Sequence, residues 1–231
     1  MPLFSVVVVD YDGSVPRDRA LRGLASVAAQ RCRDFEVILL HDGPRRNGSY
    51  ERELEGLDFP MLRIVESGQR IGDWGHSLRD RGIGLAAGDW IIHFNADNIL
   101  YPEALATLAA ETDKSSGFSV EVHHEDDGTR RRMAVSDPRI MVFPVLMRGM
   151  AIVAGHLIRF PEFDEAFSIV LSGLPPLHNR VDCMQVVAHR DLWREVGGWY
   201  DKSEDSDWKI YEHLFDLAYP RYVPRILGEH W

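Results

Sequence analysis

The stretch Trp90-Ile91-Ile92-His93-Phe94, followed at once by Asn95-Ala96-Asp97-Asn98, decides the fold of this chain. A largely apolar run of this length is typical of a strand that is buried on both faces of a parallel sheet. The polar residues that follow place carboxylate and amide oxygens at the strand end, where open α/β sheets bind ligands. Such oxygens suit Mg²⁺ or Mn²⁺ bridging a diphosphate. Asn and Asp are also common turn formers, so this interpretation needs support from the rest of the chain.

An alternation of strands and helices precedes this stretch. Continuous apolar runs indicate buried strands, and apolar residues at helical spacing indicate the helices that connect them. This pattern predicts an α/β fold with a doubly wound, mostly parallel sheet, a Rossmann-like nucleotide-binding half and a smaller acceptor-binding half. The strands are predicted over residues 4–9, 35–40, 61–65 and 90–94, and the helices over 15–30 and 74–87.

The second half of the sequence is less regular. A helix is predicted over 102–112, and alternating strands over 119–135 flank Asp127-Gly128, a dipeptide typical of hairpin turns. Residues 144–179 match no single element, and we assign them to the acceptor side of the molecule. Within them, 147–160 is too interrupted to span a bilayer but is compatible with peripheral contact to a membrane.

The composition restricts the class of protein. With 231 residues and 45% hydrophobic content, the chain can bury one large core, so we expect a single domain over 1–231. The formal charge of −10 argues against broad binding to nucleic acid, which requires a basic surface.

The cysteines and the amino terminus bear on localisation. Cys32 and Cys183 lie far apart and form no CxxC motif, which indicates neither a disulfide framework nor a zinc site. No basic leader precedes the first strand, and no apolar run approaches the roughly 20 residues that cross a bilayer. We therefore expect a soluble cytoplasmic protein, and the oligomeric state stays open.

Several short stretches follow one another in the first half: Ser5–Asp12 (SVVVVDYD), the helix ending at Gln30, Asp34–Val37, Asp42-Gly43, Leu78–Ile83, Ala87–Ile91 and Asn95–Asn98. A later segment contains Arg190–Trp199 (RDLWREVGGW) and Ser203-Glu204-Asp205. In order and spacing these stretches resemble family 2 glycosyltransferases, which have the GT-A fold, invert the anomeric centre and carry Gly-Gly-aromatic and then Glu-Asp at the place of the later segment. The resemblance covers about residues 3–110 and 185–231. It implies a nucleotide-sugar-binding half, about 1–112, and an acceptor-binding and catalytic half, about 113–231.

The resemblance implies which residues bind the donor, a nucleotide diphosphate sugar. Tyr11 and Asp12 match the family's contact with the nucleotide base, where an aromatic ring can stack. Asp42 matches a carboxylate that accepts the N3–H of uracil, which favours a UDP-sugar, although His41 stands where a first Asp is common. Arg79 matches an arginine near the uridine and phosphates, a role that suits the paired donors of a guanidinium.

The resemblance also implies a divalent metal, Mn²⁺ or Mg²⁺. Asp97 matches the central carboxylate of the family's DxD-type motif, while Asn95 and Asn98 stand where other carboxylates are frequent. His230 is similar to a histidine that some GT-A enzymes use as a further metal ligand. Because divalent affinity rises with ligand charge, the two amides leave a metal-poor or metal-independent variant open.

An inverting transferase needs a carboxylate that takes the proton from the acceptor hydroxyl. The resemblance assigns this role to Asp205 and places Glu204 beside it. We assign Trp199, Glu204 and Asp182 to the hydroxyl-bearing acceptor, which is a saccharide, a lipid-linked molecule or a small molecule. A core position for Trp199 and a surface-loop position for Asp182 are the alternatives. The same acidic segment also suits a helix N-terminus, where carboxylates offset the helix dipole.

Two other functions compete with transfer of a sugar. A nucleotidyltransferase would carry a basic Gly-rich loop after the first strand, and the acidic Asp10–Ser14 disfavours it. A noncatalytic sugar-nucleotide or glycan binder is favoured by Asn95 and Asn98 but disfavoured by the intact Glu204-Asp205 pair. A transferase acting on hydroxylated bases of DNA is a narrower variant that the net charge disfavours.

Overall fold

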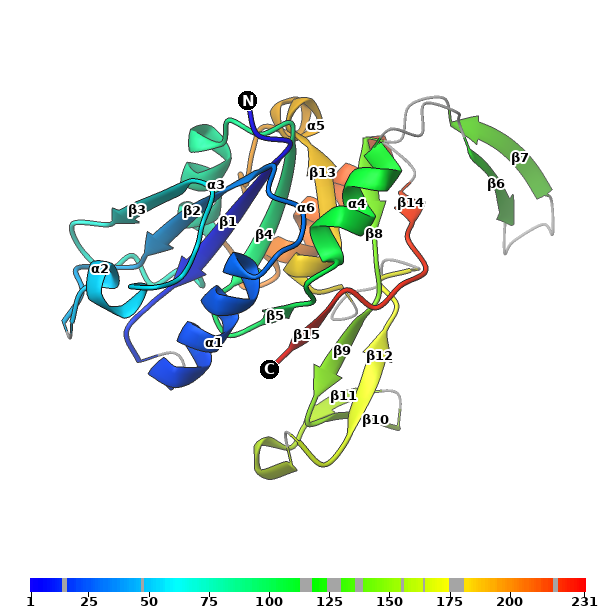
Figure 1. Ribbon diagram of the computed structural model, residues 1–231. Coiled ribbons are helices and arrows are strands. Elements are labelled where there is room, and N and C mark those ends of the chain that lie inside the picture. The colour runs from blue at the N-terminus through cyan, green and yellow to red at the C-terminus, as the bar shows by residue number, and fades with distance from the viewer. Residues whose placement is uncertain are drawn as a thin grey trace.

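The computed structural model describes residues 1–13, 16–46, 48–112, 118–123, 130–135, 139–154, 156–163, 165–174, 181–217 and 220–231. Its main sheet has seven strands in the order β14-β8-β13-β4-β1-β2-β3 (Figure 1). These strands are β1 (Phe4–Asp10), β2 (Phe35–His41), β3 (Leu62–Glu66), β4 (Trp90–Asn95), β8 (Ile140–Val142), β13 (Val186–His189) and β14 (Arg221–Tyr222).

The first half of the sheet confirms the predicted parallel order. Strand β1 pairs in parallel with both β2 and β4, and β3 extends this block beyond β2. On the other side of β4, β13 is antiparallel to both β4 and β8, and β14 runs parallel to β8. Strands from both halves of the sequence therefore form one sheet.

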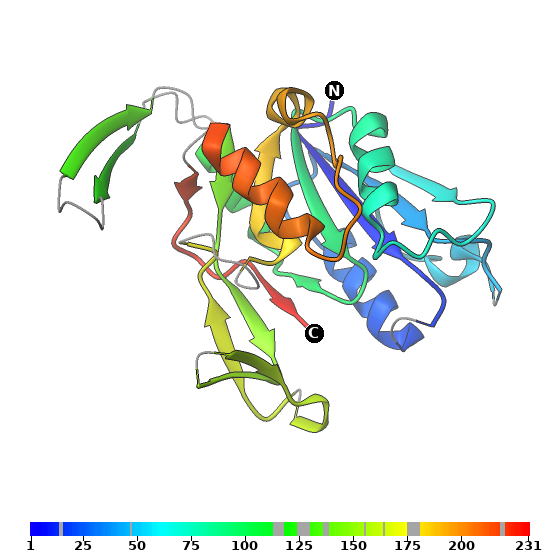
Figure 2. The same ribbon diagram turned by 180° about the vertical axis from the view of Figure 1, so that it is seen from behind.

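Helices cover both faces of this sheet, as Figures 1 and 2 show. Side chains alternate across β1, so that Val6 and Val8 pack under α1 and α4, while Val7 packs under α3, α5 and α6. This alternation explains why a continuous apolar run was needed in the strand. The helices are α1 (Arg17–Ala28), the short α2 (Tyr50–Glu53), α3 (His76–Leu85), α4 (Ala104–Thr112), α5 (Arg190–Val196) and α6 (Ser206–Leu217).

Helix α1 packs closely against the loop that follows β4. A Cβ atom at Gly23 would lie 1.9 Å from the carbonyl oxygen of Ala96 and 2.5 Å from that of Asn98. Only a glycine permits this approach of helix and loop. The position of the polar loop 95–98 therefore depends on the packing of α1.

A second sheet joins the end of the chain to its middle. Strand β15 pairs in parallel with β9 and antiparallel with β5, and Glu229 is in register with both Ile99 and Leu146. The last residues of the chain therefore lie beside the loop that follows β4. The sheet has the order β12 (Ser168–Leu171), β9 (Val145–Arg148), β15 (Gly228–His230) and β5 (Ile99–Leu100).

The predicted hairpin exists as β6 (Phe118–His123) paired antiparallel with β7 (Arg130–Val135), but its predicted turn at Asp127-Gly128 lies outside the described residues. The unassigned segment 144–179 contributes β9 and β12, together with β10, β11 and a short 3-10 helix. No helix in the described parts of the chain has both the length and the apolar character needed to cross a membrane. The additional elements are β10 (Met150–Val153), β11 (His156–Arg159), η1 (Pro161–Phe163) and η2 (Cys183–Gln185).

Candidate active site

The carboxyl ends of β1, β2 and β4 open into a pocket of about 460 Å³. Ligands of parallel α/β sheets bind at this edge, where strands end and loops begin. The pocket brings together the predicted residues Tyr11, Asp42, Asn95, Asp97 and His230. The remaining lining consists of Val9, Asp10, Arg70, Gly72, Trp74, Gly75, Ala96, Arg159 and Trp231.

Tyr11, Asp42 and Arg70 lie together in this lining. The guanidinium carbon of Arg70 lies 3.7 Å from the centre of the Tyr11 ring, which is a cation–π contact. The buried Asp42 carboxylate accepts hydrogen bonds from the backbone N–H groups of Ile71 (2.7 Å) and Gly72 (3.0 Å). A carboxylate accepts about four hydrogen bonds, so Asp42 keeps capacity for a ligand. This group offers a nucleobase both an aromatic face and an acceptor.

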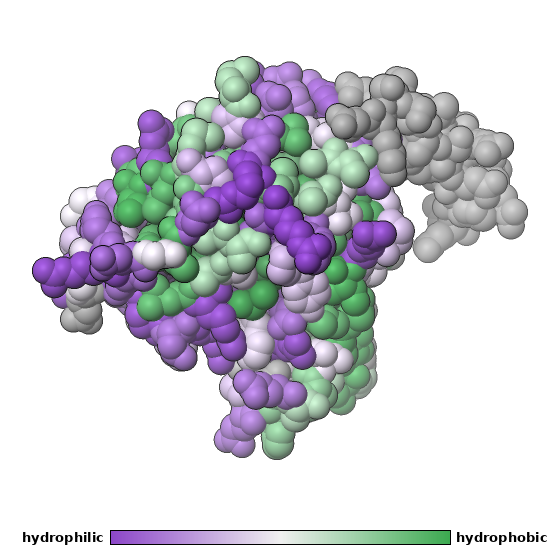
Figure 3. All heavy atoms as spheres, in the orientation of Figure 1, coloured by the Kyte–Doolittle hydropathy of each residue, from purple (hydrophilic) through white to green (hydrophobic). Residues whose placement is uncertain are grey.

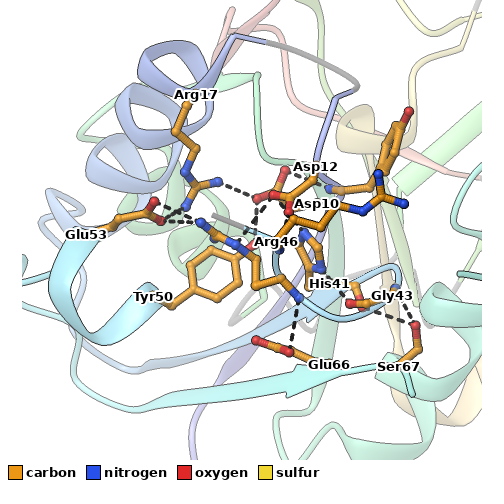
Figure 4. Close-up of polar contacts among 12 residues, drawn as sticks. Asp10, Asp12, Arg17, His41, Gly43, Arg46, Tyr50, Glu53, Glu66 and Ser67 are labelled. Atoms are coloured by element: carbon orange, nitrogen blue, oxygen red, sulfur yellow. Dashed lines mark hydrogen bonds and ion pairs between the residues drawn. The ribbon is translucent and has the colours of Figure 1, made fainter. Parts of the chain in front are cut away.

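Asp12 lies in a smaller neighbouring pocket of about 150 Å³. Its carboxylate accepts a hydrogen bond from the backbone N–H of Arg46 at 2.7 Å and lies 3.4 Å from His41 Nε2 (Figure 4). Burial raises the pKa of Asp12, but the Arg46 amide and the charges of His41 and Arg45 together lower it below its usual value. Asp12 therefore fixes the loop after β2 and does not line the larger pocket.

Asp10 has no role in the sequence-based assignment, although it lines both pockets. It is 5% exposed, and its carboxylate accepts hydrogen bonds from Tyr50 Oη (2.5 Å) and Arg17 Nη1 (2.7 Å). Arg17 also contacts Glu53, which Arg45 binds through Nη2 at 2.8 Å. Figure 4 shows how this network joins α1, α2 and the end of β1. The positive charge of Arg17 offsets the negative charge of Asp10, and the network fixes the position of the start of α1.

Arg79 lies behind the pocket wall and is 4% exposed. Its Nη2 donates a hydrogen bond to Asn95 Oδ1 at 2.6 Å, and its Nη1 donates one to the Trp74 carbonyl at 2.8 Å. Arg79 is not part of the pocket lining, so the structure gives it a supporting position. The contact also engages the side-chain oxygen of Asn95, the atom that could have bound a metal.

The side chains of Asp97, Asp182 and His230 interact electrostatically with one another. His230 Nδ1 lies 2.8 Å from Asp182 Oδ2. Burial lowers the pKa of His230, but the Asp182 and Asp97 carboxylates together raise it above its usual value. Burial raises the pKa of Asp182, and His230 and the Met184 amide bring it below its usual value. The Asp182 carboxylate therefore contacts both His230 and Met184. It accepts a hydrogen bond from the backbone N–H of Met184 at 2.9 Å.

Only part of a metal site is preformed. Among the residues that the structure describes, no cluster of three or more His, Cys, Asp or Glu side chains could hold an ion. Asp97 and His230 line the pocket, whereas Asn98 is fully buried and does not. Burial raises the pKa of Asp97, so a nearby cation would favour its ionised form. With Nδ1 engaged by Asp182, Nε2 is the His230 nitrogen left for a metal, an arrangement found in many metal sites.

Trp199 lies in the core, although the sequence analysis assigned it to the acceptor. It is 0% exposed, and its ring is stacked with those of His76 (5.8 Å) and Trp193 (5.8 Å). Its Nε1 donates a hydrogen bond to Ser206 Oγ at 2.7 Å. The ring therefore has no face available to a sugar, and its contact with Ser206 fixes the start of α6.

Glu204 and Asp205 are exposed and directly precede α6, and neither is among the pocket-lining residues. Two residues later, Asp207 Oδ1 lies 3.6 Å from His76 Nδ1. The ring centre of His76 lies 6.3 Å from that of Trp74, which lines the pocket. The acidic segment is thus connected to Trp74 in the pocket wall through two contacts, Asp207 with His76 and His76 with Trp74.

The sequence analysis also missed three long side chains of the pocket wall. Trp74 is 64% exposed and has a φ of 55°, a left-handed conformation that is uncommon for a bulky residue. Arg159 comes from the middle of the chain, in which the sequence analysis assigned no motif. Trp231 is the last residue, and its ring lies 4.2 Å from the guanidinium carbon of Arg22. Its proximity to the site depends on the pairing of β15, which local sequence does not reveal.

Comparison with known proteins identifies the class. The model of glycosyl transferase family 2 matches residues 5–172, which is more than half of the chain. The chain therefore belongs to glycosyl transferase family 2. This confirms the resemblance inferred from the sequence.

Curated relatives include PGL/p-HBAD biosynthesis glycosyltransferases of Mycobacterium bovis and Mycobacterium tuberculosis. Each is 32% identical over 116 residues, which are 47% of this chain and 41% of the relative. The chain thus matches less than half of the length of these relatives.

Solved structures share the GT-A fold. S. aureus TarS 1-349 in complex with UDP has a TM-score of 0.66 at 14% identity, over 100% of this chain and 60% of that chain. The mannosyltransferase PcManGT from Pyrobaculum calidifontis, in complex with GDP-Man and Mn²⁺, has a TM-score of 0.61 at 14% identity, over 99% and 56%. At these identities the likeness concerns the fold alone.

Proposed function

We propose that this glycosyltransferase moves a sugar from a UDP-sugar to a hydroxyl group of an acceptor, with inversion at the anomeric carbon. The observation that carries the proposal is the single pocket in which Tyr11, Asp42, Asp97 and His230 meet at the carboxyl ends of the strands. Tyr11 and Asp42 would bind the base, and Asp97 and His230 would bind the diphosphate through a metal ion. Their presence in one pocket therefore suits a nucleotide diphosphate sugar. The presence of UDP in TarS, a protein of the same fold, supports uracil as the base.

A divalent ion, Mn²⁺ or Mg²⁺, would be held by Asp97 and His230. Bound there, it would supply positive charge to the departing diphosphate. We assign Asp182 to orienting His230 instead of binding the acceptor, because its carboxylate lies 2.8 Å from His230 Nδ1. PcManGT, which holds Mn²⁺ together with GDP-Man, supports a metal in this fold.

Asp205 is our candidate for the catalytic base. An oxygen of the acceptor hydroxyl forms a bond to the anomeric carbon while the bond from that carbon to the diphosphate oxygen breaks. The proton of the hydroxyl passes to the Asp205 carboxylate, and the electron pair of the broken bond leaves with the diphosphate. An acceptor bound over Trp74 would reach this segment, because Trp74 contacts His76 and His76 contacts Asp207.

Trp74 replaces Trp199 as our candidate for stacking on a sugar. Its ring is 64% exposed and lines the pocket, and aromatic faces pack well against the apolar faces of sugars. The hydrogen bond from buried Arg79 to the Trp74 carbonyl holds the left-handed backbone in place. Strain maintained in this way is frequent at functional sites.

The described residues of 145–171, which leave out 155 and 164, form an arm beside the pocket that we propose as the acceptor side. Its exposed apolar side chains include Ile152, Val153, Phe163 and Val170, and Figure 3 shows apolar surface along it. Peripheral membrane contact, if the enzyme makes it, would use this arm. We propose a cytoplasmic location, because both cysteines are free thiols, as is usual in a reducing compartment.

The test is calorimetric titration with UDP-, GDP- and dTDP-sugars, with and without Mn²⁺. Binding of UDP-sugars alone, strengthened by Mn²⁺, is the expected result. Preference for a GDP-sugar would overturn the donor assignment but leave the transferase class intact. Absence of binding to every nucleotide sugar would overturn the proposal.

A further inference from the structure

The Asp97 side of the pocket has few negative charges with which to hold a cation. Asn95 and Asn98 replace two carboxylates, the side-chain oxygen of Asn95 is engaged by Arg79, and Asn98 is buried. Asp97 lies in the lining together with His230. The lining holds two further carboxylates, but Asp10 is bonded to Tyr50 and Arg17, and Asp42 accepts hydrogen bonds from the Ile71 and Gly72 amides. Since divalent affinity falls as negatively charged ligands are lost, a metal alone is a weak source of positive charge here. A diphosphate leaving group needs further cationic groups.

Arg159 is placed to supply that charge. It is the last residue of β11 and lines the same pocket as Asp97 and His230. The backbone around it is fixed by the pairing with Met150 and by the hydrogen bond from the Phe160 N–H to the Gly149 carbonyl at 2.7 Å.

Among the described residues, two arginines line the pocket, Arg159 and Arg70. Arg70, the second arginine of the lining, lies on Tyr11. Arg79 is buried behind the wall, and Arg148 binds Glu229 through Nη2 at 2.6 Å and through Nε at 2.8 Å. Arg159 is therefore the guanidinium that shares the lining with Asp97 and His230 without stacking on the ring of Tyr11.

We infer that Arg159 binds the diphosphate of the donor and stabilises the charge that collects on it during transfer. The inference rests on the proposed donor class and adds a residue that no motif marks. As the bond between the anomeric carbon and the diphosphate oxygen breaks, the electron pair moves onto that oxygen. A guanidinium meets phosphate oxygens with paired donors, which strengthens the contact as negative charge grows.

The experiment compares UDP with UMP in calorimetric titrations of the wild type, Arg159→Gln and Arg159→Lys, with Mn²⁺ and with EDTA. We expect Arg159→Gln to raise the Kd for UDP roughly tenfold or more in EDTA. The reason is that the loss of one hydrogen bond to a charged group weakens binding by at least about tenfold. The affinity for UMP should change much less. Arg159→Lys should recover part of the loss, because it keeps the charge but loses the planar fork.

Arg63→Gln is the matched control, because Arg63 is an exposed arginine of β3 outside the pocket lining. It should leave both affinities at wild-type values. Equal UDP binding by the wild type and Arg159→Gln, with UDP still preferred over UMP, would overturn the role of Arg159 alone. If the wild type bound neither UDP nor GDP under any condition, the proposed donor and the role of Arg159 would both be overturned.

Discussion

At the scale of single residues, the protein uses two neighbouring carboxylates differently. Asp207 lies 3.6 Å from His76 Nδ1, inside the contacts that link α6 to the pocket wall. Asp205 is exposed one residue before α6 begins. The sequence marks both residues as acidic but does not show which one lies against His76.

The replacement Asp205→Asn tests the catalytic base. We expect kcat to fall by at least about 10²-fold, because the amide keeps the shape of the side chain but cannot take the proton. The donor Kd should stay at its wild-type value. Asp207→Asn is the matched variant and should lose less rate. Wild-type turnover in Asp205→Asn, with a collapse in Asp207→Asn, would move the role of base to Asp207.

The replacement Asp182→Asn tests whether Asp182 orients His230 or binds the acceptor. We expect the affinity for Mn²⁺ in the presence of UDP to fall by about 10-fold to 100-fold, the usual effect of losing such a partner. A metal titration measures this effect without turnover. An unchanged Mn²⁺ affinity with a raised KM for the acceptor would restore the sequence-based assignment of Asp182.

At the scale of elements, the strand–helix alternation predicted the first half of the fold closely. The helix expected over 15–30 is α1 (Arg17–Ala28), and the strand expected over 90–94 is β4 (Trp90–Asn95). Buried parallel strands carry a continuous apolar run, which is a strong local signal. The segment 144–179 could not be assigned, because its strands are short and depend on partners distant in sequence.

The packing of α1 on the loop after β4 gives a prediction at this scale. A methyl group at Gly23 would overlap the Ala96 carbonyl, so Gly23→Ala should lower the free energy of unfolding by about 1–3 kcal/mol. Gly84→Ala is the control within another helix, because an added Cβ there meets no atom within 4 Å. It should stabilise the protein by about 0.5–1 kcal/mol. Urea denaturation measures both, and a Gly23→Ala protein of wild-type stability would show that the loop adjusts freely.

At the scale of the whole molecule, the site depends on contacts that span the chain. The sequence placed Tyr11, Asp42 and Asp97 at strand ends, and the parallel order of the sheet brings them together. His230 reaches the same pocket because β15 pairs with β5 and β9. Local patterns do not encode such long-range pairing, so the sequence identified His230 only through the family resemblance. The division into donor and acceptor halves stays a prediction, since one sheet contains strands of both.

Glu229 provides a test of this long-range assembly. Its buried carboxylate accepts hydrogen bonds from Arg148 Nη2 (2.6 Å), Arg148 Nε (2.8 Å) and Tyr101 Oη (2.8 Å). The contacts join β15 to β9 and to the segment after β5. We expect Glu229→Gln to lower the free energy of unfolding by about 1–3 kcal/mol, the effect of losing a hydrogen-bonded charge.

The pH dependence of that loss identifies its cause. Burial raises the pKa of Glu229, but Arg148 and Tyr101 together bring it below its usual value of 4.5. Its stabilising contribution is therefore fully present above about pH 4.5 and disappears as the pH falls through the lowered folded-state pKa. The difference between the wild type and Glu229→Gln should shrink accordingly in acid.

Glu103→Gln is the control for the Glu229 experiment. Glu103 forms an ion pair with Arg31 at 2.9 Å, but their side chains are 50% and 70% exposed. Water and salt screen such a pair, so the loss should stay within about 0.5 kcal/mol. Denaturation at several pH values compares the two variants. Equal losses in both would mean that the Glu229 contacts do not hold the end of the chain against its middle, and that β15 is kept at the site by strand pairing alone.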